Sequence, residues 1–274
     1  MIRLNKIIPF ILIINYSFGF SQNLFDENNT FKFADYLFKT RQYTLASEEF
    51  ERLIQMVPQN SEYKLTLIQS YILNKKYDFA EKRMVDFFSD SLYSLHTPFS
   101  SEYLKIKFYQ SDLSGAQKYL NSNLNIETNS KVKYQEYIYL LSRNWNRADS
   151  FFRAVNGIDS RLGQLAQNGI SLHHKVPGLA ALMSSIIPGT GKVYSGYWKE
   201  GLMSFIFVAA NSWQTYRRYD KYGPNNAGVW VFGTLAAGFY LGNIYGSIKS
   251  AKRYNKTRND EIYNRAKGII FSDI

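Results

Sequence analysis

The residue types that carry most enzyme chemistry are scarce in this sequence. It has no cysteine, which excludes disulfides, thiolate zinc sites and cysteine nucleophiles, and it has three histidines, His96, His173 and His174. The adjacent His173 and His174 have no Asp or Glu nearby, and neighbouring side chains on a helix point about 100° apart. We therefore expect them to lie in a solvated linker and not at a metal site.

A glycine-rich stretch, Gly189-x-Gly191-Lys192, is similar to part of a phosphate loop but lacks two required residues. Ile186 stands where the first glycine of such a loop is needed, and Val193 replaces the Ser or Thr. Hydrolase elbows, zinc-protease motifs and dinucleotide fingerprints do not occur in the sequence. We therefore expect a protein that is not an enzyme and that binds no metal and no cofactor.

The first residues have the pattern of an export signal. Arg3 and Lys6 form a short positive region, residues 7–20 are mostly apolar, and Gly19-Phe20-Ser21 places small residues where signal peptidase reads them. This pattern predicts a signal peptide over residues 1–21 with cleavage before Gln22. The alternative is an uncleaved N-terminal anchor, for which the apolar run is short.

A motif that places alanine three residues after an aromatic residue or leucine, and a large apolar residue four positions later, occurs four times. The copies are Tyr43-x-x-Ala46 with Phe50, Tyr77-x-x-Ala80 with Met84, Leu113-x-x-Ala116 with Leu120, and Trp145-x-x-Ala148 with Phe152. Their alanines are 34, 36 and 32 residues apart, which brackets the period of a common two-helix repeat. Because alanine lets two helices approach closely, each copy is expected to be one half of a helical hairpin.

This motif resembles the second helix of the tetratricopeptide-repeat family, and the resemblance covers residues 29–158. It implies an all-α solenoid of helical hairpins whose concave side binds a peptide or helix of a partner. Ala34 and Pro58 make the first unit the best match, whereas Lys107 and Gln135 stand where the third and fourth units should be apolar. In the family's register the partner-binding groove is lined by Phe31, Asp35, Lys39, Gln69, Ile72, Lys105, Tyr109 and Tyr137.

After a linker predicted over residues 159–176, the composition changes to that of a membrane domain over residues 177–254. Two apolar runs, 201–216 and 227–248, extend about 27 Å (from Lys199) and about 33 Å as helices, against a hydrocarbon layer of about 30 Å. They predict a membrane-embedded helical hairpin, and the shorter run 177–187 predicts a half-inserted helix. The alternative is a soluble all-helical domain, which Asn211, Gln214 and Asn243 favour.

Glycines mark two further features of the predicted membrane domain. Gly238, Gly242 and Gly246 recur every four residues and predict a helix-packing seam. The loop before the hairpin contains Pro188, Gly189, Gly191, Tyr194 and Gly196. This Pro-Gly-x-Gly-x-x-Tyr-x-Gly pattern resembles a small bacterial membrane domain of unknown function, and the resemblance implies membrane embedding without an activity.

The net charge of +11 is concentrated beside the apolar runs, with +8 from Lys175 onward and +3 before it. This placement is typical of topology signals and of contact with anionic lipids, and it argues against a nucleic-acid partner. If both runs cross the membrane from a periplasmic repeat domain, the cluster from Lys249 to Arg258 lies outside, against the positive-inside tendency. The number of crossings and the side of a basic C-terminal tail, predicted over residues 255–274, therefore stay open.

Together these features predict a bacterial inner-membrane protein whose repeat domain lies in the periplasm. Its expected function is that of a non-enzymatic scaffold or adaptor that binds another envelope protein through its repeats. The alternative is an oligomeric membrane-embedded factor that contacts lipids or assists assembly under regulation by the repeats. Membrane lipids and a second copy of the chain are the other expected partners.

Overall fold

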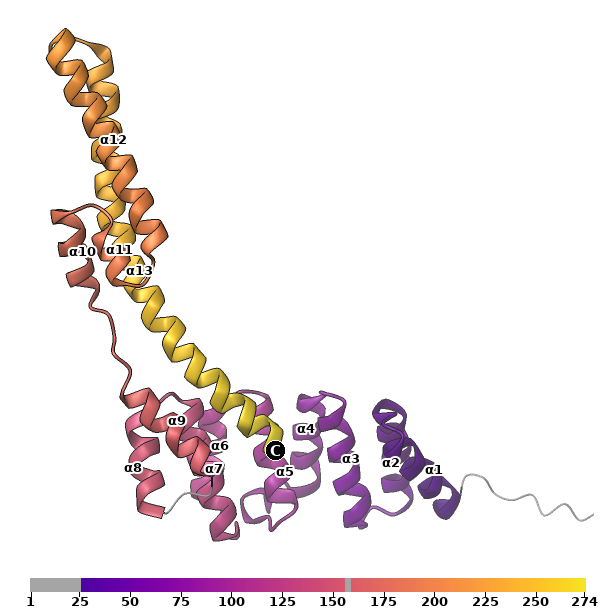
Figure 1. Cartoon of the computed structure of the whole chain (residues 1–274). Helices are drawn as coiled ribbons and strands as arrows, with labels where there is room; N and C mark the ends of the chain where they lie inside the picture. The colour runs from indigo at the N-terminus through magenta and orange to yellow at the C-terminus, as the bar shows by residue number, and fades with distance from the viewer. Residues whose placement is uncertain (1–25, 156–158) are drawn as a thin grey trace, which may run out of the picture. The chain divides into compact units, whose positions relative to one another are not determined.

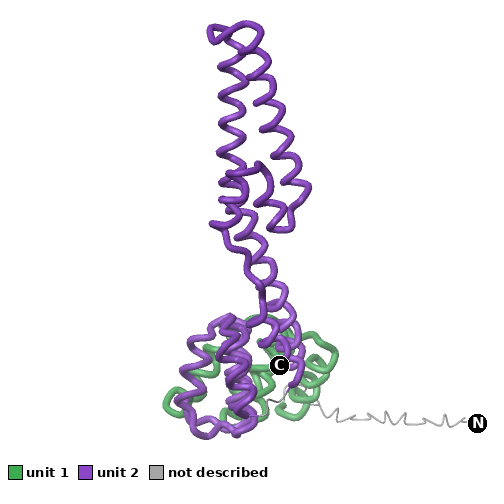
Figure 2. The backbone as a smooth tube through the Cα atoms, turned by 60° about the vertical axis from the view of Figure 1, so that its left-hand side comes forward, with its two compact units in different colours: residues 1–92 green, residues 93–274 purple. Residues whose placement is uncertain are grey.

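The computed structural model describes residues 26–155 and 159–274, so the predicted signal peptide, residues 1–21, lies outside the described residues. Within these two ranges all regular structure is helical and no strand occurs, in agreement with the all-α prediction (Figure 1). The chain divides into two compact units, residues 1–92 and 93–274 (Figure 2).

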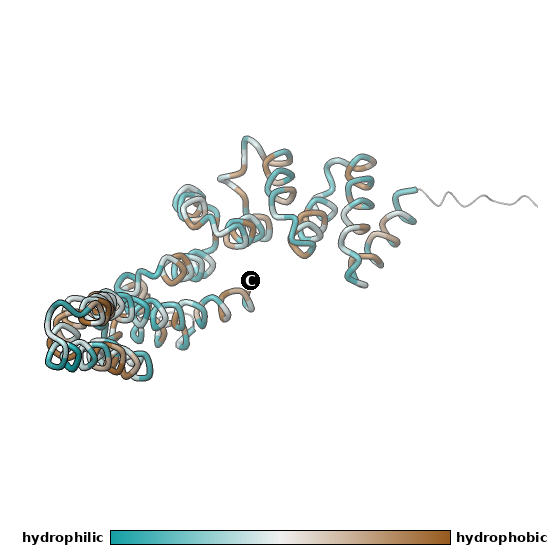
Figure 3. Tube along the Cα trace, turned by 90° about the horizontal axis from the view of Figure 1, so that it is seen from above, coloured by the Kyte–Doolittle hydropathy of each residue, from teal (hydrophilic) through white to brown (hydrophobic). Residues whose placement is uncertain are grey.

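The first unit consists of two helical pairs. They are formed by α1 (Glu27–Lys39), α2 (Tyr43–Met56), α3 (Ser61–Leu73) and α4 (Tyr77–Phe88). Each helix packs against the next along the chain, and apolar and polar residues alternate along the repeat helices (Figure 3). The core contains Ala34, Leu37, Ala46, Phe50, Leu53, Tyr63 and Leu67.

The second unit continues the helical pairs. It begins after the short 3-10 turn η1 (Leu92–Ser94) and contains α5 (Phe99–Tyr109), α6 (Leu113–Ser122), α7 (Thr128–Leu141), α8 (Trp145–Val155) and α9 (Ser160–Ile170). Consecutive helices in this series pack against each other. The motif alanines of both units, Ala46, Ala80, Ala116 and Ala148, are at most 1% exposed, as their predicted role at close helix contacts requires.

The same turn precedes each motif helix. A residue in the left-handed region, Arg41, Lys75, Ser111 or Arg143, lies two positions before α2, α4, α6 and α8, with φ of 63°, 59°, 61° and 57°. In each turn this residue donates its N–H to the carbonyl three residues back, and the next residue donates to the carbonyl five residues back, at 2.8–3.0 Å. These are the two hydrogen bonds of a Schellman cap, so one backbone geometry occurs four times at the spacing of the alanines.

The two polar residues at expected apolar positions are both paired. Lys107 is 9% exposed, and its Nζ lies 3.1 Å from a carboxylate oxygen of Asp112 and over the ring of Tyr103. The amide groups of Gln135 and Gln117 exchange two hydrogen bonds of 2.8 Å between α7 and α6. Polar pairs therefore replace apolar contacts in the third and fourth helical pairs.

The rest of the second unit contains the predicted membrane segments. α10 (Pro177–Ile186) and the short α11 (Thr190–Tyr194) pack against α13 (Ala227–Asp273), and α12 (Trp198–Tyr222) packs along the first part of α13 (Figure 1). Among the described residues α13 is the one helix long and apolar enough to cross a membrane, and 6% of its apolar window is buried. Such an exposed apolar surface does not match the core of a soluble domain.

Two predicted boundaries differ from the structure. The expected linker, residues 159–176, contains α9, whose Gly163 and Gly169 leave room for the rings of Phe152 and Trp145 on α8. The expected basic tail, residues 255–274, is helical as far as Asp273 because α13 continues through it. The glycines of the first stretch and the positive charges of the second led the sequence analysis to predict a linker and a tail in place of helices.

Candidate functional site

The eight predicted groove residues all lie on the first helix of a pair. Phe31, Asp35 and Lys39 lie on α1, Gln69 and Ile72 on α3, Lys105 and Tyr109 on α5, and Tyr137 on α7. In the first unit, Lys39 Nζ lies 2.6 Å from Asp35 and Phe31 contacts the ring of Tyr63, whereas Ile72 is 8% exposed. Asp35 and Lys39 are therefore the members of this set that carry charge on the first unit's surface.

Tyr109 and Tyr137, two of the three groove residues of the second unit, both contact the end of α13. The ring of Tyr109 meets the ring of Phe271 edge to face at 5.3 Å between centroids. The Tyr137 hydroxyl donates a hydrogen bond to Asp273, whose carboxylate also lies 2.5 Å from Lys133 Nζ. The chain's own C-terminal segment thus covers part of the surface predicted for a partner.

The docked part of α13 buries one apolar stripe. Ile262, Ala266 and Ile270, spaced four residues apart, are 8%, 0% and 0% exposed, and this part of α13 packs against α7 and α9. Residues at this spacing lie on one face of a helix. Below, residues 259–273 are called the docked segment.

Polar contacts fix the other end of the docked segment. Asp260 forms an ion pair with Arg143, with 2.8 Å between a carboxylate oxygen and a guanidinium nitrogen. The Arg143 guanidinium also lies over the Tyr263 ring, 4.4 Å from its centroid. The Trp145 indole N–H points to Asn259 Oδ1 at 3.4 Å. Because Arg143 and Trp145 belong to the turn and first position of the fourth motif, the repeat residues themselves hold the segment.

A small polar cavity lies beside the last residues of α13. It has a volume of about 290 Å³, and its walls include Glu136, Asp159, Arg161 and Asp273. Glu136 is 2% exposed, and its Oε1 has no hydrogen-bond partner among the described residues. Burial, and secondarily the charge of Asp159, raise the pKa of Glu136 to about 7.

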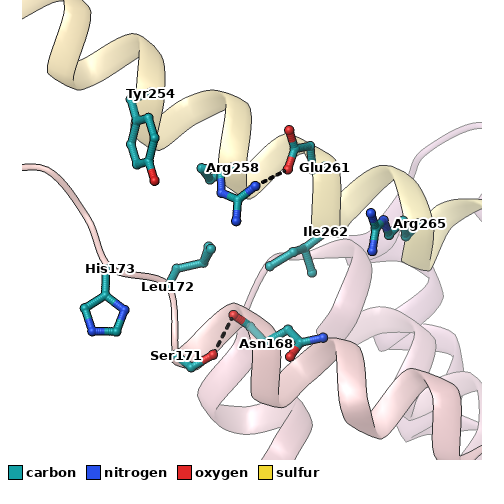
Figure 4. Close-up of a pocket in the computed structure, with 9 residues that line it drawn as sticks. All are labelled: Asn168, Ser171, Leu172, His173, Tyr254, Arg258, Glu261, Ile262 and Arg265. Atoms are coloured by element: carbon teal, nitrogen blue, oxygen red, sulfur yellow. Dashed lines mark hydrogen bonds and ion pairs between the residues drawn. The ribbon is translucent and has the colours of Figure 1, made fainter. Parts of the chain in front are cut away.

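A second cavity, of about 330 Å³, lies between the end of α9 and α13 (Figure 4). Arg258, Arg265 and His173 make its walls basic, and its carboxylate, Glu261, is paired with Arg258 at 2.9 Å. No group of acidic and histidine side chains suited to a metal occurs in residues 26–155 and 159–274.

The predicted membrane loop is held by buried polar side chains of α13 and α10. Asn243 Oδ1 accepts from the N–H of Gly189 at 2.9 Å, and its Nδ2 donates to the carbonyl of Ser184 at 3.2 Å. Ser184 Oγ accepts from the N–H of Gly191 at 2.8 Å and lies 2.7 Å from Ser247 Oγ. Backbone groups that water cannot reach are thereby satisfied, as an apolar environment requires.

Four of the five members of the predicted loop set contribute to this geometry. Gly189 and Gly196 have φ of 92° and 86°, and Pro188 precedes the first of these turns. A Cβ on Gly189 would lie 2.0 Å from the Gly201 carbonyl oxygen, and one on Gly191 would lie 1.8 Å from that of Ala180. The Tyr194 hydroxyl accepts from the N–H of Val176, so it closes the loop onto the start of α10.

No family model, curated protein or solved structure matches this chain.

The glycine seam is only partly covered within the chain. Gly238 and Gly242 have nothing within 4 Å of a Cβ position, whereas Lys192 Nζ would lie 3.2 Å from a Cβ on Gly246. Lys192 itself donates to Ser204 Oγ on α12 at 2.8 Å. Gly238 and Gly242 therefore present bare backbone on α13.

Sequence reasoning missed the docked segment and the polar residues that hold the loop. The signal for the first was the spacing of Ile262, Ala266 and Ile270, which is that of one helix face. The signal for the second was Asn243 followed four residues later by Ser247 in an otherwise apolar run. In the sequence Asn243 favoured a soluble domain, whereas in the structure its side chain accepts a hydrogen bond from the loop at Gly189.

Proposed function

We propose that this protein is a non-enzymatic, membrane-anchored adaptor of tetratricopeptide type that binds another envelope protein through its helical repeats. The observation that carries the proposal is the fourfold repetition of one Schellman turn and one buried alanine, joined in a single chain to an apolar helix with 6% of its window buried. Repeated helical pairs expose extended surfaces suited to peptides and helices.

For the anchor, we propose that α12 and the first part of α13 cross the inner membrane as a hairpin and that α10 is half-inserted. The exposed aromatic residues Trp198, Trp213, Tyr216, Tyr219 and Trp230 lie toward the helix ends, where amphipathic rings meet the membrane surface. The export signal predicted for residues 1–21 supports a periplasmic location for the repeats.

Photo-crosslinking in intact cells tests the adaptor function. A photoreactive residue in place of Lys39 on α1, whose side chain is 72% exposed, is expected to capture an envelope protein. The matched control replaces Lys82, an exposed lysine on the second helix of the next pair, and is expected to capture none. Equal capture at both positions, or none at Lys39, would contradict the proposal.

The open face at Gly238 and Gly242 supports the alternative of an oligomeric membrane factor. A bulky side chain on this face separates helices that pack through it. If the alternative holds, Gly242→Ile abolishes self-association of the purified chain in detergent. Unchanged association would remove the basis of this alternative and leave the adaptor as the remaining proposal.

A further inference from the structure

The docked segment matches the face of the repeats in three separate ways. Its apolar stripe meets α7 and α9, its Asp260 end is held by Arg143 of the fourth turn, and its Asp273 end is held by Lys133 and Tyr137. Apolar anchors at a four-residue spacing, flanked by polar contacts that fix the register, are how an amphipathic helix is recognised in a groove.

The docked segment is held by weak contacts and by its connection to the rest of α13. Two of its three stripe residues are large, and the side chains of the Lys133–Asp273 pair are 30% and 48% exposed. Ion pairs this exposed contribute little to stability. A tether raises the local concentration of such a weakly bound segment far above that of a free ligand.

Just before the docked segment, α13 contacts the stretch between α9 and α10. Lys256, Thr257 and Arg258 are exposed, and Asn255 is bonded to the backbone of Lys175 by hydrogen bonds of 2.7 and 2.8 Å. The contacts with α5, α7 and the turn before α8 all involve residues 259–273.

We infer that the face formed by α7 and α9, with Tyr109 of α5, is a receptor for an amphipathic helix, and that the chain's own docked segment is its resident occupant. This inference rests on the proposed function in one respect: a partner that uses this face must displace the segment with a helix of the same pattern. That pattern is a large, a small and a large apolar residue four positions apart, with a carboxylate three positions after the last.

The test uses the full-length chain in mild detergent. The chain has no cysteine of its own, so introduced cysteines are the only ones present. The pair Tyr109→Cys and Phe271→Cys reports docking through a disulfide, because the two rings are in contact. A fluorescent peptide with the sequence of residues 255–274 is the ligand probe. It is expected to bind an Ala266→Arg chain at least tenfold more tightly than the unmodified chain, whose face is occupied.

Ala266→Arg places a charged side chain at a position that is 0% exposed and is expected to abolish the disulfide. Thr257→Arg, which adds the same charge at an exposed position of the same helix, is the control and should leave both measurements unchanged. Asp273→Lys, a milder change at the edge of the contact, is expected to raise peptide binding severalfold and keeps the test valid if Ala266→Arg does not fold.

Three results would overturn the inference: a disulfide that survives Ala266→Arg, peptide binding that is equal in all variants, or no peptide binding at all. Mixing chains that carry only one cysteine each tests the occupant, since a disulfide formed solely between chains would assign the face to a second copy's helix. None of these measurements involves an envelope partner. Failure to capture a protein at Lys39 would therefore contradict the adaptor without affecting the docked segment.

Discussion

Glu136 is predicted to make the stability of the repeats depend on pH. Its pKa is 4.5 in the unfolded chain and about 7 in the folded one, so the carboxyl is protonated in both states at low pH. As the pH rises from 4.5 to 7 the unfolded state ionises first, and stability is lost. Above pH 7 we expect Glu136→Gln to be more stable than the unmodified chain by on the order of 2 kcal/mol.

Denaturant unfolding of both proteins at pH 5 and pH 8 checks this prediction. The other groups around the cavity, Lys133, Asp159, Arg161 and Asp273, are common to both proteins, so the difference isolates Glu136. A stability difference that does not grow with pH would show that the carboxyl is not held in an apolar environment.

Gly189 is predicted to tolerate no side chain. Its φ of 92° and the 2.0 Å approach of a Cβ to the Gly201 carbonyl oxygen both oppose substitution, so Gly189→Ala should destabilise the membrane domain by ~3 kcal/mol or more. Gly178→Ala on α10, where nothing lies within 4 Å, is the control and is expected to be neutral or slightly stabilising. The aggregation temperature of each protein in detergent measures the effect.

The four left-handed turns that precede the motif helices offer a direct test of the repeat. Lys75 has a φ of 59°, which costs a residue with a Cβ about 1 kcal/mol and costs glycine little. Lys75→Gly should therefore stabilise the chain by about 0.5–1 kcal/mol. Lys76→Gly, one residue later at φ −92°, gains nothing from glycine and should be neutral or destabilising; thermal unfolding of the two variants gives the comparison.

The extent to which the sequence predicts these elements depends on what each helix packs against. Tyr43, Tyr77, Leu113 and Trp145 mark the first residues of four helices because their alanines fix local contacts within a pair. The sequence indicates turns before α4, α6 and α8, but not their left-handed geometry, since Lys, Ser and Arg stand where glycine is usual. The docked segment could not be placed at all, because its stripe meets α7 and α9, which lie at least 92 residues away in the sequence.

For the whole molecule, the docked segment predicts which parts share one side of the membrane. If α12 and α13 cross as a hairpin, a cysteine at Ser272 and one at Lys118 on α6 should react with an impermeant maleimide under the same conditions. A cysteine at Asn225, in the turn between α12 and α13, should react under the opposite conditions. In spheroplasts the periplasmic orientation predicts labelling at 118 and 272 and protection at 225.

Reversed labelling at all three positions would keep the hairpin but place the repeats in the cytoplasm, as the positive-inside tendency of the Lys249 to Arg258 cluster favours. Labelling of residue 272 under the conditions that label residue 225 would contradict the docked segment itself.

The continuity of α13 has a mechanical consequence. In the proposed membrane arrangement, the part of this helix beyond Lys249 is a stiff arm of about 36 Å, so a ~10° tilt of the hairpin swings its far end by ~6 Å. A displacement of this size exceeds what the contacts of Asp260 and Asp273 can follow. Bilayer thickness, which influences hairpin tilt, is then coupled to whether the face formed by α7 and α9 is covered or open.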